Sequence, residues 1–203
     1  MRKIFVTGIG TGIGKTIVSA VIAEALQADY WKPIQAGLAD GTDSETVKNL
    51  IRNSKTKIHP EAFRLAMPAS PHTAAAAENI SIKIKDFQLP HTTNNLVIEG
   101  AGGLMVPFND KELMIDLIPH FHAEVILVVR HYLGSINHTL LSLEALSSRK
   151  IPLMGIVFNG EPNEMSEKAI LSFFPVPVIG RIKEEINFNT SIVSAYAEKF
   201  KPI

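Results

Sequence analysis

The sequence VTGIGTGIGKT, from Val6 to Thr16, constrains the fold of this chain more than any other stretch, because its glycines indicate a loop that wraps a phosphate group. Two known glycine patterns compete for it. The dinucleotide-binding pattern G-x-G-x-x-G fails, since its third glycine would fall on Ile13 or Lys15. The phosphate-loop pattern G-x-x-x-x-G-K-[ST] fits its ending at Gly14–Thr16, but its first glycine would fall on Ile9. The choice between the two patterns therefore depends on the secondary structure predicted around the loop.

The predicted neighbours of this loop favour a phosphate loop. Lys3–Thr7 is predicted to form a strand, and Lys15–Leu26 a helix with an apolar stripe. In that setting the glycines let backbone N–H groups approach phosphate oxygens, and the helix N-terminus adds positive potential. Lys15 then reaches the outer phosphates, and the Thr16 hydroxyl can bind Mg²⁺. The stretch predicts a triphosphate site, and the alternative is an ordinary glycine-rich turn before a helix.

Apolar runs and amphipathic stretches alternate along the rest of the chain, without internal repeats. Further strands are predicted at Asp29–Ile34, Asn95–Glu99, Glu124–Val129, Leu153–Asn159 and Val176–Gly180, and helices near Ser44–Arg52, Glu112–Ile118, Ile136–Arg149, Asn163–Phe174 and Asn189–Phe200. Strands such as EVILVV are apolar on both faces, which is typical of a sheet covered by helices on both sides. The predicted fold class is α/β: a mostly parallel sheet flanked by helices, in one P-loop NTPase-like domain spanning residues 1–203.

Charge and composition exclude several classes of protein. The 20 basic residues balance the 20 acidic ones, so we expect neither a nucleic acid nor a membrane as partner. The absence of cysteine excludes disulfides, thiolate zinc sites and a cysteine nucleophile. The short apolar run Ile4–Val6 is too short for a signal peptide, and no stretch approaches a membrane span, so we expect a cytoplasmic protein.

A Mg²⁺ ion held by one hydroxyl and the phosphates generally needs carboxylate ligands, and two candidates follow predicted strands. Glu99 ends the apolar segment NLVIEG, where a bare carboxylate needs a charged partner. Asp43 comes after the second strand, where a helix is predicted to begin. The alternative for Asp43 is that it or a neighbour caps that helix, with Glu45 completing a capping box from Thr42.

Two further stretches are candidates for anion binding. Lys32, in YWKPIQAG, is either a lysine that reaches solvent from a strand end or a second cation that faces the triphosphate during phosphoryl transfer. In LGSINHT, Gly134 and Ser135 turn the chain into a helix whose free N–H groups suit a carboxylate. The alternative there is an ordinary helix start capped by Ser135 or Asn137.

Taken together, a set of motifs resembles the dethiobiotin synthetase family, and the likeness runs along nearly the whole chain. The motifs are VTGIGTGIGKT at Val6–Thr16, KPIQAG at Lys32–Gly37, PASPH at Pro68–His72, VIEGAGG at Val97–Gly103 and LGSINHTLL at Leu133–Leu141. Each motif is modest alone, but their order along the chain is specific.

In that family ATP, Mg²⁺ and CO₂ convert 7,8-diaminopelargonate into the cyclic urea dethiobiotin. The resemblance implies three steps: an amine captures CO₂ as a carbamate, ATP converts the carbamate into a carbamic-phosphoric anhydride, and the second amine displaces phosphate to close the ring. It also implies a homodimer that takes ATP and Mg²⁺ as cofactors and the diamine and CO₂ as small-molecule substrates. Such chemistry depends mainly on positioning and charge, which agrees with a site of lysines, backbone amides and metal.

The resemblance also assigns roles to residues of this chain. Lys15 and Lys32 should flank the transferred phosphoryl group and the carbamate, and Thr11 is the third catalytic candidate. The nucleotide should contact Gly12, Ile13, Gly14, Lys15, Thr16, Ile17, Asp43, Glu99, Gly100, Ala101, Gly102, Asn159 and Gly160, with Asn159 recognising adenine. The Mg²⁺ ligands should be Thr16, Asp43 and Glu99. The substrate should contact Ala36, Ser70 and Pro71, and its carboxylate should be clamped across the dimer interface by Gly134, Ser135, Ile136 and Asn137.

Some positions depart from the family pattern. Ala36 stands where a serine or threonine is usual, so that hydroxyl contact is lost or is supplied by Gln35. Gly12 replaces an acidic residue found in some members, and Gly160 stands where an aspartate is often present. Lys183–Glu185 follow VIGRI, where the family often has proline. These departures leave the adenine pocket and the strictness for ATP open.

Two other readings of the phosphate loop remain. The first is a positioning ATPase, of the kind that partitions plasmids or places the division site. Such ATPases resemble one another in carrying a lysine early in the phosphate loop, and this chain has no lysine near Gly10. An amide-forming ligase on a similar scaffold would need another source of ammonia, because the chain has no cysteine and no predicted glutaminase domain.

Overall fold

The computed structural model describes residues 1–200 and is built around a parallel sheet. The seven strands of the main sheet lie in the order β4-β2-β6-β1-β7-β8-β9, and all their pairings are parallel. Their bounds are β1 Lys3–Gly8, β2 Asp29–Trp31, β4 Ile58–His59, β6 Leu96–Gly103, β7 Glu124–Val129, β8 Leu153–Asn159 and β9 Val178–Ile182. A second, two-stranded sheet joins β3 (Ile34–Ala36) to β5 (Phe63–Leu65).

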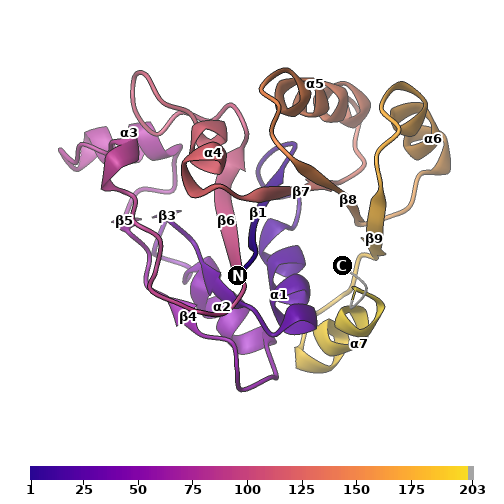
Figure 1. Ribbon diagram of the computed structural model, residues 1–203, viewed down its shortest axis with the longest axis horizontal. Coiled ribbons are helices and arrows are strands. Elements are labelled where there is room, and N and C mark those ends of the chain that lie inside the picture. The colour runs from indigo at the N-terminus through magenta and orange to yellow at the C-terminus, as the bar shows by residue number, and fades with distance from the viewer. Residues whose placement is uncertain (201–203) are drawn as a thin grey trace.

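Helices cover both faces of the main sheet (Figure 1). They are α1 Lys15–Leu26, α2 Asp43–Leu50, α3 Pro71–Ala77, α4 Leu117–Phe121, α5 Ser135–Ser148, α6 Glu164–Phe173 and α7 Thr190–Phe200, with short 3₁₀ turns at Ile84–Asp86 and Met114–Asp116. The helices α1, α2 and α7 pack against one face and α4 to α6 against the other, while α3 packs against the two-stranded sheet. The predicted α/β fold with a mostly parallel, helix-flanked sheet is confirmed.

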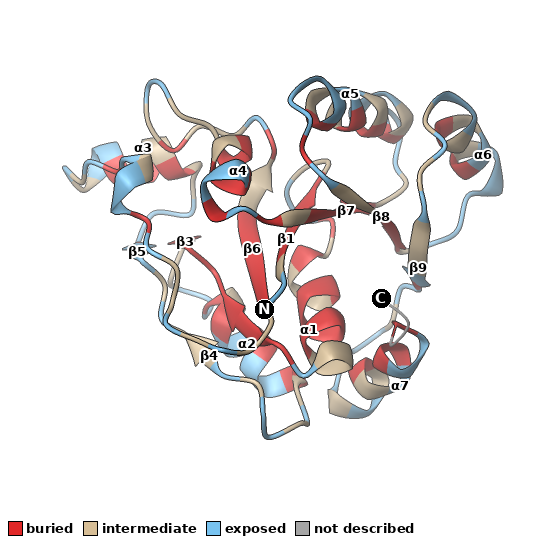
Figure 2. Ribbon diagram, viewed as in Figure 1, coloured by how far each residue is buried: buried red, intermediate tan, exposed pale blue. Residues whose placement is uncertain are grey.

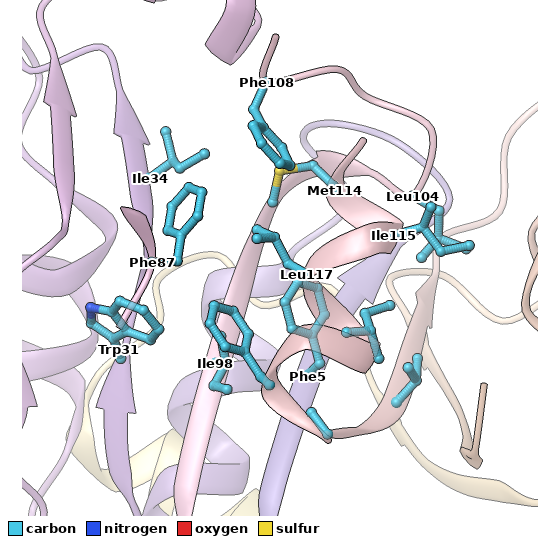
Figure 3. Packing of buried hydrophobic residues seen from close by; sticks show 14 of the residues in the cluster. Phe5, Trp31, Ile34, Phe87, Ile98, Leu104, Phe108, Met114, Ile115 and Leu117 are labelled. Atoms are coloured by element: carbon cyan, nitrogen blue, oxygen red, sulfur yellow. The ribbon is translucent and has the colours of Figure 1, made fainter. Parts of the chain in front are cut away.

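The central strands are buried on both sides (Figure 2). On β1, Ile4 and Val6 belong to the apolar cluster under α1 and α7, while Phe5 belongs to the opposite cluster, as the alternation of a strand requires. Figure 3 shows that second cluster, in which Phe5, Trp31 and Ile98 lie with the aromatic ring of Phe87 and the aliphatic residues after β6. Phe87 meets Phe108 edge to face at 5.5 Å between ring centres, which closes this side of the core.

Several predicted boundaries were wrong, for local reasons. The strand predicted at Asp29–Ile34 ends at Trp31, because Pro33 has no N–H for a ladder, and the chain resumes as β3 in the second sheet, where the Pro33 carbonyl accepts from Phe63 N at 3.0 Å. The helix predicted at Glu112–Ile118 begins later, as a 3₁₀ turn followed by α4.

Other differences from the predicted elements are small. The last strand, predicted at Val176–Gly180, lies two residues further on, since Ile156 pairs with Val178 just after Pro177. The short elements β4, β5 and α3 were not predicted, because each has too few residues to show a period. None of the helices formed by residues 1–200 has the length and apolar character that a membrane crossing requires.

Candidate functional site

A cavity of about 720 Å³ opens at the carboxyl edge of the main sheet, where the predicted motifs meet. It is lined by Thr11, Gly12, Gly14, Lys15, Thr16, Ile17, Lys32, Gln35, Ala36, Asp43, Pro68, Ala69, Ser70, Pro71, Glu99, Ala101, Gly102 and Val106. The phosphate loop, the segment from β2 to α2, the start of α3 and the end of β6 thus contribute to one space. Most of the residues singled out from the sequence line it.

The phosphate loop has a backbone that depends on its glycines. Gly12 and Gly14 have φ angles of 71° and 91°, in the left-handed region, and Gly14 immediately precedes α1. At Gly14 an added Cβ would lie 2.2 Å from Asn159 Nδ2, so a side chain has no space there. At these two glycines the loop consists of backbone alone, which suits the close approach of phosphate oxygens.

Lys15 is buried inside its own loop. Its Nζ donates to the Gly10 carbonyl at 2.8 Å, which folds the side chain back over the loop. The pKa of Lys15 is lowered to about 8: burial is the main cause and the charge of Lys32 adds to it, while the charges of Glu99 and Asp43 act in the opposite direction. The ammonium group has a neutral carbonyl as its hydrogen-bond partner, so a bound phosphate would give it a stronger, charge-assisted hydrogen bond.

Lys32 joins two carboxylates that come from different elements. Its Nζ lies 2.6 Å from Asp43 Oδ2 and 3.0 Å from Glu99 Oε1. All but 6% of the Lys32 side chain is buried, as is all but 1% of the Glu99 side chain. Lys32 does not extend into solvent from the strand end, and the alternative that it does is wrong.

Electrostatics keep this group ionised. Burial acts to lower the pKa of Lys32, but the charges of Glu99 and Asp43 outweigh it, so the pKa of Lys32 is raised. For Asp43, burial acts to raise the pKa, and the charge of Lys32 with hydrogen bonds from Lys32 and Thr16 lowers it overall. Lys32 is therefore a fixed cation, and Asp43 a fixed anion, near neutral pH.

The start of α2 shows how Asp43 is left available. The Thr42 hydroxyl accepts from Glu45 N at 3.1 Å, and Glu45 Oε2 accepts from Thr42 N at 2.8 Å, which forms a capping box. Thr42 is thus the cap, and the carboxylate of Asp43 instead faces Thr16 and Lys32. Gln35 supports this position, because its Oε1 accepts from Asp43 N at 3.1 Å.

Three oxygen-bearing side chains meet beside the phosphate loop. The Thr16 hydroxyl lies 2.6 Å from Asp43 Oδ1 and 3.0 Å from Glu99 Oε1. One hydroxyl and two carboxylates form the hard oxygen donor set that Mg²⁺ prefers, with phosphate oxygens and water to complete it. Thr16, Asp43 and Glu99 therefore fit a Mg²⁺ ion.

Tyr30 was not predicted to belong to the site. Its hydroxyl donates to Glu99 Oε2 at 2.8 Å, so both carboxylate oxygens of Glu99 are held, one by Tyr30 and one by Lys32 and Thr16. Tyr30 lies two residues before Lys32, and the period of a strand could have placed both on one face. Val106, also missed, lies at the cavity wall against Gly102 and gave no sequence signal of its own.

The start of α5 does not reach this cavity. Gly134, Ile136 and Asn137 line a separate hollow of about 870 Å³, while Ser135 is buried in the first turn of the helix. Gly134 has a φ angle of 103°, and no side chain caps the helix, so the alternative of a side-chain cap by Ser135 or Asn137 is wrong. The first N–H groups of α5 therefore have no side-chain partner at the cap.

Asn159, at the end of β8, contacts the phosphate loop itself. Its Nδ2 donates to the Ile13 carbonyl at 2.8 Å, and the residue is 8% exposed. Ile13, Asn159 and Gly160 do not line the main cavity, and neither does Gly100, which packs against Phe5.

An ion pair joins Arg130 to Glu184, with 2.7 Å between the guanidinium nitrogen and the carboxylate oxygen. This pair joins the end of β7 to the segment after β9. The segment that departs from the family pattern is thus tied to the sheet.

The chain is similar in sequence to a family model and to several named proteins. The model of the family described as "AAA domain" matches residues 2–190. A protein of Christiangramia forsetii, named ATP-dependent dethiobiotin synthetase BioD, is 54% identical over 98% of this chain and 96% of its own length. A protein of the same name from Cytophaga hutchinsonii is 50% identical over 98% of this chain and 97% of its own.

Solved structures support the fold. The cell division ATPase MinD of Pyrococcus furiosus aligns with a TM-score of 0.59 at 15% identity, over 100% of this chain and 99% of that one. The septum site-determining protein MinD of Pyrococcus horikoshii, complexed with Mg-ADP, gives 0.58 at 18% identity, over 99% and 89%. At such identities the likeness concerns the fold alone, and it confirms the P-loop NTPase-like class.

Proposed function

The chain belongs to the family of ATP-dependent dethiobiotin synthetases, and from this membership we infer that it is an ATP-dependent ligase that forms dethiobiotin in biotin biosynthesis. One observation supports the location of the proposed active site: a single cavity is lined by Lys15, Lys32, Thr16, Asp43 and Glu99. These side chains supply two cations for phosphate and an oxygen donor set for a metal ion.

The reaction we propose begins with an amine of 7,8-diaminopelargonate, which binds CO₂ as a carbamate. Transfer of the ATP γ-phosphoryl group to the carbamate then gives a carbamic-phosphoric anhydride, and the second amine displaces phosphate to close the ring. Charge gathers on phosphoryl and carbamate oxygens throughout, and we propose that Lys15 and Lys32 stabilise that charge. Thr11 lines the same cavity and is proposed to contact the transferred group.

Thr16, Asp43 and Glu99 are proposed to hold Mg²⁺, which when bound neutralises phosphate charge and orients the outer phosphates. The nucleotide would lie over the phosphate loop from Gly12 to Ile17 and along the end of β6 at Ala101 and Gly102. Gly100 would act indirectly, since its place against Phe5 sets the path of that segment.

For base recognition we propose Asn159. Its Nδ2 already donates to Ile13, so Oδ1 is the atom left to accept a hydrogen bond from the exocyclic amine of adenine. Gly160 follows with a φ angle of 98°, which turns the chain beside that amide.

The substrate is proposed to lie against Ala36, Ser70 and Pro71, which line the same cavity as the phosphate loop. Its carboxylate would be held by the α5 start, Gly134 to Asn137, of a second copy in a homodimer. Two observations support a second copy: this helix start lies outside the chain's own cavity, and Leu133 and Leu141 beside it are exposed, Leu133 fully.

The test is phosphate release by the purified protein with MgATP and bicarbonate, with and without 7,8-diaminopelargonate, with the product identified by mass spectrometry. We expect release that depends on the diamine and a product with the mass of dethiobiotin. Release that does not depend on the diamine, or none, would contradict the proposal and favour a positioning ATPase or an amide-forming ligase.

A further inference from the structure

Three side chains at the start of α3 form a connected hydrogen-bonded set. The Ser70 hydroxyl lies 3.1 Å from His72 Nδ1 and 3.0 Å from Thr73 Oγ1, and Thr73 Oγ1 lies 3.2 Å from His72 Nε2. Both ring nitrogens of His72 therefore have a hydroxyl partner. The backbone at this position is held as well, because His72 N donates to the Pro107 carbonyl at 3.3 Å.

This set runs from the cavity to the surface. Ser70 lines the main cavity, whereas Thr73 is exposed to solvent. His72 is half-buried between them. The arrangement is a continuous path of exchangeable protons from the substrate space to bulk water.

The proposed reaction needs such a path. An alkylamine is mostly protonated at neutral pH, yet only the neutral amine is a nucleophile, and each C–N bond that forms leaves the nitrogen with a proton to lose. The cavity must therefore release protons in every turnover.

The other titratable groups of the cavity have competing partners. Lys32 is held as a cation by Asp43 and Glu99, and those two carboxylates also face Thr16 and the proposed metal. The Nζ of Lys15 donates to the Gly10 carbonyl in the phosphate loop. Among the described residues lining the cavity, Ser70 is the one whose hydroxyl contacts an imidazole.

We propose, on the basis of the function proposed above, that His72 accepts the proton that the substrate amine gives up during ring closure, through the hydroxyl of Ser70, and returns it to water beside Thr73. Histidine suits this step because imidazole exchanges protons near neutral pH and can accept at one nitrogen while donating from the other. Ser70 thus gains a second role beyond contact with the substrate, and His72 acts through it as a positioning and proton-accepting residue.

The step balances as follows in atoms and charge. The second amine nitrogen bonds to the carbonyl carbon of the anhydride, the bond from that carbon to the phosphate oxygen breaks, and phosphate leaves with the electron pair. The nitrogen passes one proton to Ser70 Oγ while the Ser70 proton moves to His72 Nδ1. The imidazolium then releases its Nε2 proton to water at Thr73, which leaves His72 neutral with its proton on Nδ1. Loss of the Nδ1 proton and uptake of one at Nε2, by exchange with water, return the ring to its starting tautomer before the next turnover.

Charged groups near α3 are engaged elsewhere. On the neighbouring β5, Arg64 pairs with Glu61 at 3.0 Å, and Glu78 at the end of α3 accepts from Ala66 N at 2.6 Å. In the segment after Pro107, Glu112 accepts from Ile84 N, while Asp110 is exposed. Within residues 1–200, His72 forms no ion pair with any of them, and its ring nitrogens contact the two hydroxyl groups.

The test is the pH dependence of kcat for the intact enzyme with MgATP and 7,8-diaminopelargonate, at a fixed concentration of dissolved CO₂. We expect His72→Gln to lower kcat by about 10²-fold near neutral pH and to leave the KM for MgATP unchanged. The deficit should shrink as the pH rises, because the amine then loses its proton to water without help. Ser70→Ala should change the pH profile in the same direction, and Thr73→Val less.

His122→Gln is the matched control. His122 is exposed and precedes β7, at the opposite edge of the sheet, so its variant should behave like the wild type. Equal loss at every pH, or wild-type kcat in both His72→Gln and Ser70→Ala, would overturn the relay. If His72→Gln does not fold, as thermal unfolding would show, the profile of Ser70→Ala decides. Failure of the wild type to form dethiobiotin would instead refute the proposed function.

Discussion

The ammonium nitrogen of Lys32 lies 2.6 Å from Asp43 Oδ2, so the residue that follows β2 is held against the first residue of α2 inside the cavity. The same nitrogen contacts Glu99 at 3.0 Å, and Glu99 in turn contacts Thr16 of the phosphate loop. A cation, two anions and a hydroxyl are thereby fixed before any ligand binds. Preorganised charge of this kind costs no rearrangement during the reaction.

Lys32→Ala should lower turnover by about 10²-fold to 10³-fold, because it removes a cation from the place where phosphoryl charge develops. Nucleotide affinity should change little, since Lys15 and the loop backbone remain. Steady-state kinetics and calorimetric titration with a non-hydrolysable ATP analogue separate the two effects. Lys48→Ala, on the exposed side of α2, is the control, and unchanged turnover in Lys32→Ala would refute the role.

Glu99→Gln should raise the Mg²⁺ concentration required for half-maximal activity, because an amide oxygen is a weaker and uncharged ligand for a hard cation. The substitution keeps the shape of the side chain. A Mg²⁺ titration of activity measures the shift, with the exposed Glu164→Gln on α6 as control. An identical titration in variant and wild type would exclude direct ligation by Glu99.

Asn159→Asp should weaken the binding of ATP and GTP by the same factor, about tenfold, because it removes the Nδ2 donor to Ile13 in the loop that both nucleotides use, while the oxygen acceptor proposed for the adenine amine is kept. Equilibrium titration with both nucleotides measures the two losses. Loss for ATP alone would mean that the amide nitrogen contacts the base rather than the loop.

Leu133→Asp should convert a homodimer into monomers, because Leu133 is fully exposed beside the α5 start and a carboxylate there cannot be buried in an interface. Sedimentation velocity measures the change. In the monomer the KM for the diamine should rise while ATP binding is kept, since the proposed carboxylate clamp belongs to the second copy. Ile186→Asp, exposed after β9, is the control. A wild type that sediments as a monomer would contradict the dimer proposal.

Asp29→Asn should destabilise the fold by about 1–3 kcal/mol at neutral pH. Asp29 is buried and accepts from Lys57 N at 3.0 Å and Asn94 at 3.1 Å, with His59 Nε2 at 2.8 Å. Burial acts to raise its pKa, but these hydrogen bonds, first among them that from Lys57, lower it overall.

Because the folded pKa of Asp29 lies below the unfolded value near 3.8, its contribution is complete above that value and is lost as the pH falls through the folded pKa. Urea unfolding at several pH values should therefore show the difference between Asp29→Asn and wild type shrinking in strong acid. The exposed Asp110→Asn should show no such difference. A pH-independent difference would assign the effect to packing instead.

Much of the site was predictable because its parts are local. The spacing of Gly14, Lys15 and Thr16 before an apolar stripe fixed both the loop and the start of α1, and the boundaries of α1 were as predicted. The order of the motifs indicated the family. The assignment of residues 1–203 to one domain stays a prediction.

Other features could not be predicted because they depend on which strands are neighbours. The sequence near Asp43 is compatible both with a metal ligand and with a helix cap. The structure decides between these roles, because Thr42 caps α2 and leaves the carboxylate of Asp43 free of that role. Likewise, the side-chain contact of Asn159 is to Ile13, far away along the chain.

The sequence by itself determined the local geometry of this protein: a phosphate loop, the helix that follows it, and strands that are apolar on both faces. Only the tertiary structure decided which charges meet. Lys32 and Glu99 are distant in the chain and come together because β2 pairs in parallel with β6, with Trp31 beside Ile98, so that both strands end at the same edge. Strand order is set by burial of the whole core rather than by the residues at that edge, and a local pattern cannot encode it.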